Sequence, residues 1–298
     1  MTELCELLGY SKQAYYKGLQ QNEKNIFEQH IILDLVKKKR QLWKKGSGRN
    51  LLAALQDDFK EHNINLGRDR FFNLLRSNNL LTPRKTRKAV TTNSYHHFHK
   101  YPNLIRDVEP TRPNQILVSD ITYIWIWEIE NFAYLSLITD MYSRKIVGYN
   151  ISNSLAAAGA LRALKMATRS FNKKEDCIHH SDRGVQYCCH AYTKLLKNKN
   201  ITISMTENGD PLENAIAERV NRTIKEEFTN DKTLTFKSFE DAKKDVPKFI
   251  QFYNNTRPHR SIEMMTPNQA HQRSGKLKRC WKAYYKNREA KVVLLNYE

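Results

Sequence analysis

Apolar and polar positions change their period several times along the chain. Short apolar runs predict a series of strands at 116–123, 132–139, 144–151, 177–180 and 201–204. Between the later runs, residues 156–171 and 191–198 have the spacing of helices. Three consecutive strands, followed by alternating helices and strands, predict an α/β domain.

A longer helix is predicted to begin at Asp210. Asp210 is a good N-cap residue, Pro211 suits the first helical position, and Glu213 completes a capping box. The apolar residues recur every fourth position and predict the buried face: Leu212, Ile216, Val220, Ile224 and Phe228. Glu218 lies roughly 200° around the helix from residues of that face, so we expect it to point away from the core. The residues on or near its side of the helix are Asn214, Arg222 and Lys225.

Three acidic residues stand out by position. Asp120 lies inside an apolar strand, where a carboxylate is costly to bury without a partner. Asp182 follows the end of another buried strand, and Glu218 faces away from the core of the long helix. Taken singly, each is explained as a surface or capping acid. Taken together, three carboxylates suit hard cations such as Mg²⁺, and two such ions can assist an in-line displacement at phosphorus.

Several motifs containing these acids resemble one family. The segments Asp120-Ile-Thr-Tyr, His180-Ser-Asp-Arg-Gly and Glu213-Asn-Ala-Ile-Ala-Glu, with 35 residues between Asp182 and Glu218, resemble the DDE transposases of bacterial insertion sequences. They are most similar to the OrfB transposase of the insertion sequence 3 family, which is related to retroviral integrases. The segment Tyr253-Asn-Asn-Thr-Arg-Pro-His-Arg-Ser is similar to a later element of that family. Many members have Asp-Asn where this chain has Glu213-Asn214.

The resemblance covers nearly the whole chain and implies a fold and a reaction. The fold would be a ribonuclease H-like catalytic core, and the metal ligands would be Asp120, Asp182 and Glu218. The cofactor would be two Mg²⁺ ions, with Mn²⁺ as a substitute. Water would attack a phosphodiester at the end of the element, and the freed 3′-OH would then attack another DNA strand. In the family this 3′-OH first attacks the other end of the same strand.

The resemblance also implies partners. These would be double-stranded DNA, as terminal inverted repeats and as target, and an upstream-frame protein of the OrfA type. Because an element has two ends, we expect a homodimer or a higher oligomer on DNA. Two alternatives stay open, which are a DNA-binding relative that does not cut and another ribonuclease H-like nuclease.

The N-terminal third shows two helix-turn-helix patterns. The first is partial, covers residues 4–17 and has Ser11 as the cap of its second helix. A helix at 25–45 follows, with its inward residues expected at Ile26, Phe27, Ile31, Leu35 and Leu42. The second pattern consists of helices at 51–61 and 69–77.

The second helix of this later pattern is predicted to carry the DNA contacts. We expect it to expose Arg68, Arg70, Asn73 and Arg76, and to bury Phe71, Leu74 and Leu75. Recognition helices of this motif present their N-terminal residues to base edges, so Arg68 and Arg70 are placed to recognise guanine. Phosphate contacts are expected from the following basic segment, which contains Arg84, Lys85, Arg87 and Lys88. We also include Arg183, Arg222 and Lys225 among the DNA-binding residues, although Arg183 and His180 could equally shape their loop.

Composition limits the remaining possibilities. The net charge is +19, divided as +10 over residues 1–112, +3 over 113–270 and +6 over 271–298. Such basic ends favour a polyanionic partner. The longest apolar runs are shorter than eighteen residues and the N-terminus lacks a basic segment, so we expect a soluble chain without a membrane span or a secretory signal. The five cysteines have no framework spacing, which favours reduced thiols and a cytoplasmic, nucleoid-associated protein.

Other candidate sites have simpler explanations. Asp140 precedes a turn, so a turn cap is favoured over a fourth metal ligand. His96, His97 and His99 lack nearby cysteines and are expected to be polar linker residues. The expected organisation is a partial helix-turn-helix at 1–20, a helical DNA-binding region at 21–90, a basic linker at 91–114, a catalytic core at 115–232, a helical extension at 233–270 and a basic tail at 271–298. The aromatic residues of the tail could stack on bases or pack in a small strand pair near 291–295.

Overall fold

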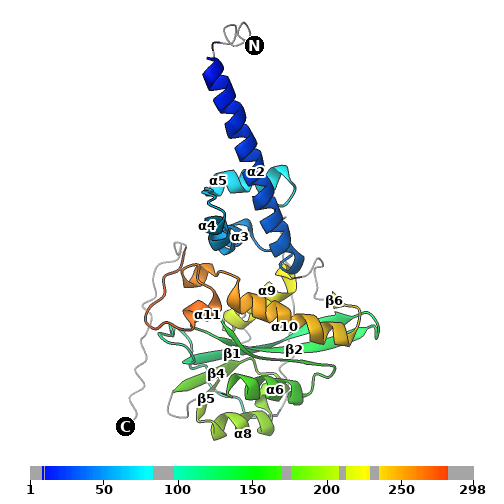
Figure 1. Ribbon diagram of the computed structural model, residues 1–298. Coiled ribbons are helices and arrows are strands. Elements are labelled where there is room, and N and C mark those ends of the chain that lie inside the picture. The colour runs from blue at the N-terminus through cyan, green and yellow to red at the C-terminus, as the bar shows by residue number, and fades with distance from the viewer. Residues whose placement is uncertain are drawn as a thin grey trace. The chain divides into compact units, whose positions relative to one another are not determined.

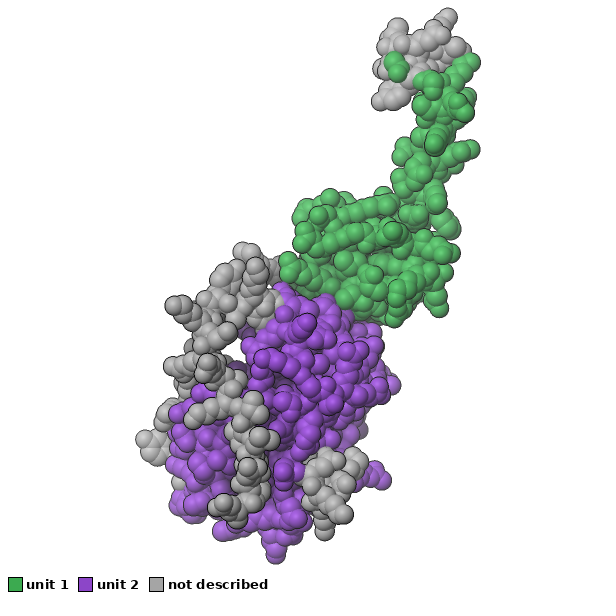
Figure 2. Space-filling model, turned by 90° about the vertical axis from the view of Figure 1, so that its left-hand side faces the viewer, with its two compact units in different colours: residues 1–83 green, residues 84–298 purple. Residues whose placement is uncertain are grey.

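The computed structural model describes residues 9, 11–82, 97–169, 176–207, 213–228 and 235–280. The chain falls into two compact units, residues 1–83 and residues 84–298, which Figure 2 shows in different colours. The basic segment 84–88 and the predicted strand pair of the tail lie outside the described residues. None of the described helices is long and apolar enough to cross a membrane.

The first unit is built from helices. Those described are α2 (Lys12–Leu42), α3 (Gly48–Ala54), α4 (Gln56–Glu61) and α5 (Arg68–Ser77). Ser11 caps α2 as predicted, because its Oγ accepts a hydrogen bond of 3.1 Å from the backbone N–H of Ala14. The predicted short helix near residues 11–17 is wrong, however, since α2 continues for 31 residues and crosses the expected boundary at residue 20. Gly18 is the only strong helix breaker in that stretch, and one glycine costs only about 1 kcal/mol relative to alanine.

The buried face of α2 also differs from the prediction. Ile26 and Phe27 are 55% and 68% exposed, whereas Ile32 and Val36 are buried. Both buried residues belong to the second half of α2, beside which the shorter helices of this unit lie (Figure 1). The apolar pattern marked the helix correctly but could not show how much of its length is covered.

The second predicted helix-turn-helix is present with one change. Its first helix is interrupted at Leu55, which separates α3 from α4 with φ −100° and ψ 0°. The helix α5 buries Phe71, Leu74 and Leu75 and exposes its basic residues, as predicted. The sequence therefore predicted which face of α5 is free to meet a partner.

The second unit is organised around one mixed sheet. Its strands are β1 (Ile116–Ile126), β2 (Asn131–Asp140), β3 (Ile146–Ser152), β4 (Cys177–Ser181), β5 (Ile201–Met205) and β6 (Thr235–Phe236). The order in the sheet is β3-β2-β1-β4-β5, and the short β6 pairs with the far end of β1. Strands β1 to β3 are antiparallel, while β4 and β5 run parallel to β1. The predicted succession of strands and helices along the chain and the α/β class are confirmed.

Helices cover both faces of this sheet (Figure 1). They are α6 (Ala157–Ala167), α7 (Val185–Cys188), α8 (His190–Asn198), α9 (Ala215–Glu227), α10 (Phe239–Asn255), the 3-10 helix η1 (Arg260–Ile262) and α11 (Pro267–Ala270). Successive side chains of a strand point to opposite faces. Leu117 packs in the cluster that includes residues of α6 and α8, whereas Ile116 and Val118 pack with Ala217 of α9. Asp120 is two residues beyond Val118, so it faces α9.

A glycine sets the contact between β3 and α6. A Cβ added at Gly148 would collide with the carbonyl oxygen of Ala163 and lie 2.8 Å from the Cβ of Ala167. These atoms belong to one helix, so relief would require α6 to move away from the sheet.

We therefore expect Gly148→Ala to lower the free energy of unfolding by about 1–3 kcal/mol, as overpacking of a core does. Urea denaturation would measure the change. Gly18→Ala is the control, because nothing lies within 4 Å of the added methyl group and alanine favours a helix. Equal effects of the two substitutions would contradict this account of the β3–α6 contact.

Candidate active site

Asp120 lies in the middle of β1 and is partly buried. Its Oδ2 accepts a hydrogen bond of 2.7 Å from the side-chain amide of Asn221, and its Oδ1 accepts one of 2.8 Å from the backbone N–H of Ile121. Burial and, next, the negative charge of Asp182 raise the pKa of Asp120 to about 7, and Glu218 adds a smaller contribution in the same direction. The three predicted acids are therefore close enough to act on one another electrostatically.

The register of the sheet places Asp182 beside Asp120. Val118 pairs with His180 across the parallel strands β1 and β4, and each acid follows its strand partner by two residues. The Oδ1 of Asp182 accepts a hydrogen bond of 3.0 Å from the N–H of Gly184. Gly184 has an ordinary φ of −64°, so the backbone at this position does not itself require glycine. A Cβ there would lie 3.0 Å from that same carboxylate oxygen, so the glycine leaves room for Asp182.

Glu218 lies in the first turn of α9 and is exposed on the side away from Val220 and Ile224, as predicted. The predicted start of this helix at Asp210 is wrong, because α9 begins at Ala215 with Asn214 in the N-cap position. Of the predicted buried face, Val220, Ile224 and Phe228 are buried and Ile216 is partly buried, while Leu212 lies outside the described residues.

Two asparagines hold α9 against β1. The side-chain amide of Asn214 donates a hydrogen bond of 3.0 Å to the carbonyl oxygen of Ser119, and that of Asn221 donates to Asp120. The two residues are seven apart, which is close to two helical turns, so both side chains lie on the face toward the strand. The helical periodicity predicts Asn214 on or near the side of Glu218, whereas its side chain contacts β1, and it gives no prediction for Asn221. The seven-residue spacing of buried amides was the available signal.

Glu213 has a different role from the predicted capping box. Its Oε2 accepts a hydrogen bond of 2.7 Å from the N–H of Glu207, and its Oε1 accepts one of 3.0 Å from Arg106. The same guanidinium nitrogen of Arg106 lies 3.2 Å from Oε2 of Glu207. A charged partner and a backbone N–H therefore occupy Glu213, and Arg106 joins residues 207 and 213. Because Asn214 comes next, this contact helps to set where α9 begins.

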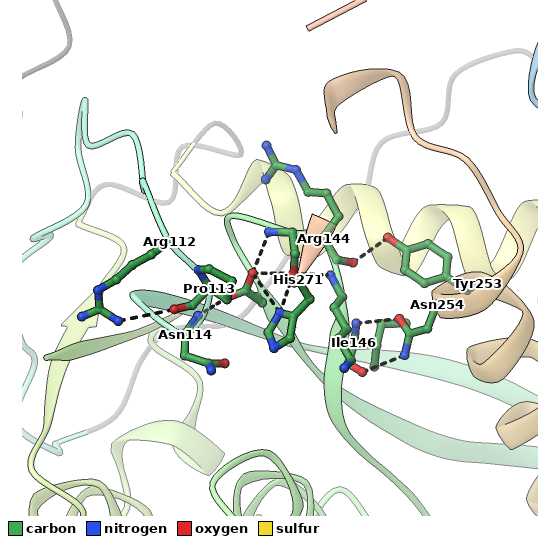
Figure 3. Close-up of polar contacts among 11 residues, drawn as sticks. Arg112, Pro113, Asn114, Arg144, Ile146, Tyr253, Asn254 and His271 are labelled. Carbon is green, nitrogen blue, oxygen red and sulfur yellow. Dashed lines mark hydrogen bonds and ion pairs between the residues drawn. The ribbon is translucent and has the colours of Figure 1, made fainter. Parts of the chain in front are cut away.

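The C-terminal end of α9 is held by the Tyr253–Ser261 segment. Both side-chain oxygens of Glu227 accept hydrogen bonds from Arg257, at 2.7 and 2.6 Å. In the same segment, Asn254 bonds to both the N–H and the carbonyl oxygen of Ile146, and the hydroxyl of Tyr253 donates to the carbonyl oxygen of Arg144 (Figure 3). This motif therefore braces α9 and the start of β3.

Asp140 is a turn cap, as predicted. Its Oδ1 accepts hydrogen bonds from the N–H and the hydroxyl of Ser143, at 2.6 and 2.5 Å. Its Oδ2 accepts one of 2.6 Å from the N–H of Asn114, and the side chain is fully buried (Figure 3). With its oxygens engaged in this way, Asp140 is not available as a fourth metal ligand.

His180 and three predicted cations differ in their surroundings. His180 is buried and its Nδ1 lies 2.8 Å from the hydroxyl of Ser204, while burial lowers its pKa to about 4, so it serves the core. Arg183 is partly buried, and Arg222 is exposed and forms an ion pair of 3.1 Å with Glu226. Burial lowers the pKa of Lys225, and the charge of Asp120 acts in the opposite direction. Of these cations, Lys225 thus lies near the carboxylates.

The donor set can be tested against a divalent cation. Oxygen ligands and the negative charges of Asp182 and Glu218 around Asp120 are what Mg²⁺ requires. Within the described residues, however, no group of three or more His, Cys, Asp or Glu side chains is drawn together as metal ligands are. The chemistry of the three acids thus fits Mg²⁺, and their side chains would have to move closer together to hold an ion.

The predicted DNA-contact residues of α5 divide into two groups. Arg68, Asn73 and Arg76 line an open pocket of about 370 Å³ together with Arg49 and others. Arg70 instead reaches α2, where it lies 3.5 Å from Glu28. Arg49 precedes the predicted helix-turn-helix at 51–77, and the sequence analysis did not include it among the DNA-contact residues.

Comparison with known proteins agrees with these features. Two models described as integrase core domain match residues 110–211 and 199–267. The chain is 31% identical over 269 residues to the insertion element IS600 uncharacterized 31 kDa protein of Shigella sonnei, covering 89% of this chain and 96% of that protein. It is 33% identical over 146 residues to the transposase for insertion sequence element IS629 of Shigella sonnei, covering 49% and 48%.

Further similarities extend this set. The transposase for insertion sequence element IS904 of Lactococcus lactis is 31% identical over 168 residues, which cover 56% of this chain and 65% of the relative. The chain thus spans about half to two thirds of the length of these two transposases. Among solved structures, the catalytic core domain of HTLV-2 integrase in complex with magnesium gives a TM-score of 0.42 at 14% identity, covering 55% of this chain and all of that one.

The chain belongs to the integrase-core family, among transposases of the insertion sequence 3 type. The resemblance and the ribonuclease H-like fold class drawn from the sequence are confirmed. The residue roles and the domain boundaries within the chain stay predictions.

The raised pKa of Asp120 makes stability depend on pH in the metal-free protein. Below about pH 4 the carboxyl is protonated in both folded and unfolded chains. As pH rises toward 7, the unfolded chain loses the proton first, so the folded state is progressively disfavoured, and the penalty is complete above pH 7. A shift of this size corresponds to at most about 4 kcal/mol.

We therefore expect Asp120→Asn, measured in a chelator, to raise the free energy of unfolding at pH 8 and to change it little at pH 4. Denaturant titrations at the two pH values would show this. The exposed Asp176 supplies the control Asp176→Asn, which should have no such dependence. A similar gain from Asp120→Asn at both pH values would mean that its charge is not the cause.

The contacts of Arg106 with Glu207 and Glu213 lead to a second prediction. Arg106→Gln should increase amide hydrogen exchange in the first turn of α9, because Glu213 loses its charged partner. Exchange near Glu227 should stay unchanged, since Arg257 holds that end. Arg222→Gln is the matched control, as it removes an ion pair from the same helix. Equal exchange in the two variants would argue against the Arg106 contact as the anchor.

Proposed function

We propose that this chain is a DDE transposase that cleaves the ends of an insertion sequence and joins them to DNA. The observation that supports it is the nearness of Asp120, within β1, to Asp182, which directly follows the neighbouring parallel strand β4, so that the charge of Asp182 raises the pKa of Asp120. Glu218 adds a third carboxylate from α9. Two Mg²⁺ ions held by these acids would stabilise the charge that develops on the attacking and leaving oxygens.

The residues around the acids orient them. Asn221 fixes one oxygen of Asp120, and the N–H of Gly184 fixes one oxygen of Asp182. Oδ1 of Asp120 also accepts a hydrogen bond from the local backbone, the N–H of Ile121. Lys225 lies near Asp120 and offers a positive charge to a DNA phosphate.

The reaction consists of two substitutions at phosphorus. In the first, a water oxygen bonds to the phosphorus at the end of the element and the bond to the 3′ oxygen breaks, which leaves a 3′-OH. In the second, this 3′-OH bonds to the phosphorus of another strand and displaces the 3′ oxygen of that strand. The first step hydrolyses a phosphodiester to a 5′-phosphate and a 3′-OH, and the second exchanges one phosphodiester bond for another, so no external energy source is required.

The first unit would bind the element ends. Arg68, Asn73 and Arg76, with Arg49, form the exposed basic pocket on and beside α5. Arg70, whose guanidinium lies near Glu28, would have to leave that contact to reach a base. Because two ends must be brought together, we propose that at least two copies assemble on DNA. A protein of the OrfA type from an upstream frame is a further proposed partner.

The activity is tested by a strand-transfer assay on DNA that carries the ends of the element. Asp120→Asn, Asp182→Asn and Glu218→Gln should each lower cleavage and transfer about a thousandfold or more, because metal-ion charge stabilisation is worth several kcal/mol. Binding of the ends should change little, since each substitution keeps the shape of the side chain.

Asp176→Asn is the control with the same change of charge at an exposed position, and it should transfer strands at the parent rate. Wild-type activity in one of the three variants would remove that residue from the site. Binding without cutting by the parent chain would favour a non-cutting relative, and cleavage of RNA–DNA hybrids would favour another nuclease.

A further inference from the structure

The turn between β2 and β3 holds an arginine in a fixed position. Arg144 has a φ of 65°, its N–H donates to the carbonyl oxygen of Asp140 at 2.9 Å, and its carbonyl oxygen accepts from the hydroxyl of Tyr253 at 3.1 Å. With the backbone held on both sides, the direction of the side chain is set. Figure 3 shows it extending away from the contacts of Tyr253, Asn254 and His271.

One nitrogen of the Arg144 guanidinium has no hydrogen-bond acceptor among the described residues. Its Nη1 is buried and makes no hydrogen bond within the described part of the chain. A buried donor left without an acceptor is costly, and more so when it carries charge. Burial lowers the pKa of Arg144 to about 10, so the group stays charged at neutral pH.

Two more arginines lie within electrostatic range of it. The charges of Arg279 and Arg219 each act to lower the pKa of Arg144, although Tyr253 and Asp140 act in the opposite direction. Several positive charges close to one another repel, and binding an anion among them relieves this repulsion. These three guanidiniums come from a strand turn, a helix and the C-terminal segment, so no single element accounts for their proximity.

The nearby acids are already engaged. Asp140 accepts from Asn114 and Ser143, and Glu227 is bonded to Arg257. Glu109 lies 3.6 Å from Arg279 and also contacts Lys276. Among the described residues, neither Arg144 nor Arg219 forms an ion pair. Glu109 therefore partners Arg279, while Nη1 of Arg144 keeps no acceptor among the described residues.

We propose that Arg144, Arg219 and Arg279 form a phosphate-binding site that takes a backbone phosphodiester of a DNA strand. A guanidinium presents parallel N–H donors, which match the two free oxygens of a phosphodiester and would satisfy Nη1 of Arg144. Arg219 lies on α9, the helix that also carries Glu218. The assignment rests on the proposed function in one respect, namely that the bound polyanion is DNA.

The test uses the full chain carrying Asp182→Asn, so that DNA is bound and not cut. Affinity for a duplex of random sequence would be measured by fluorescence anisotropy at several salt concentrations. In this background, Arg219→Gln and Arg279→Gln should each weaken binding and reduce the slope of log K against log salt by about 0.9, the value for one lost phosphate contact. Arg144→Lys should weaken binding while keeping most of the slope, because the charge stays and the fork is lost.

Arg162→Gln is the matched control, since Arg162 is exposed on α6 and bonds to Asn150. It should bind as the parent does, and thermal unfolding would verify that each variant is folded. Unchanged slopes in both Arg219→Gln and Arg279→Gln would overturn the site. So would stabilisation of the parent by inorganic phosphate that is lost in Arg144→Lys, if DNA affinity did not change, because the ligand would then be a free anion.

The outcome separates the two proposals. A chain that binds DNA with these slopes but never cuts the element ends would contradict the proposed function and support the phosphate site. A chain that cuts DNA while the arginine variants bind as the parent does would support the function and refute the site.

Discussion

The placement of a carboxylate inside the central strand of the sheet is the constraint on which the second unit depends. Asp120 replaces an apolar residue on the face of β1 that α9 covers, and burial together with Asp182 raises its pKa to about 7. The helix that covers it must supply a polar partner, which Asn221 does. The helix α9 must also leave one side of Asp120 uncovered, and Glu218 lies at that side. The docking of α9 thus combines packing of Val220 and Ile224 with two amide hydrogen bonds to β1.

The order of strands and helices was accessible from the sequence because each element carries its own apolar period. The same is true of the exposed face of α5 and of the turn cap at Asp140, since both follow from neighbours a few residues away. The features that could not be predicted depend on contacts with residues far away in the sequence. The start of α9 was misplaced because Glu213 bonds to Arg106, which lies 107 residues away. Ile26 and Phe27 were expected inside because a helical stripe does not reveal how far its covering helices extend.

In the candidate site too, the features set by neighbouring residues could be predicted and those set by distant contacts could not. Asp120, Asp182 and Glu218 were recognisable from their flanking residues, and the register of β1 and β4 accounts for the proximity of the first two. Asn221, which holds Asp120, and Arg257, which holds the end of α9 through Glu227, have no local signature that distinguishes them from ordinary polar residues. Arg144 is a similar case. Its turn conformation and its incomplete hydrogen bonding appear only when Tyr253, Asp140 and the C-terminal segment come together.

The way α9 is anchored bears on how this protein can vary. Asn214, Asn221 and Glu227 attach the helix at its beginning, middle and end, so a residue added or removed within it would break at least one attachment. The chain between residues 207 and 213 is different, because Arg106 joins its two ends directly. Residues inserted there would lengthen the separation of Asp182 from Glu218 in sequence without moving either acid. The spacing between these acids is therefore a looser marker of such a site than the residues that flank them.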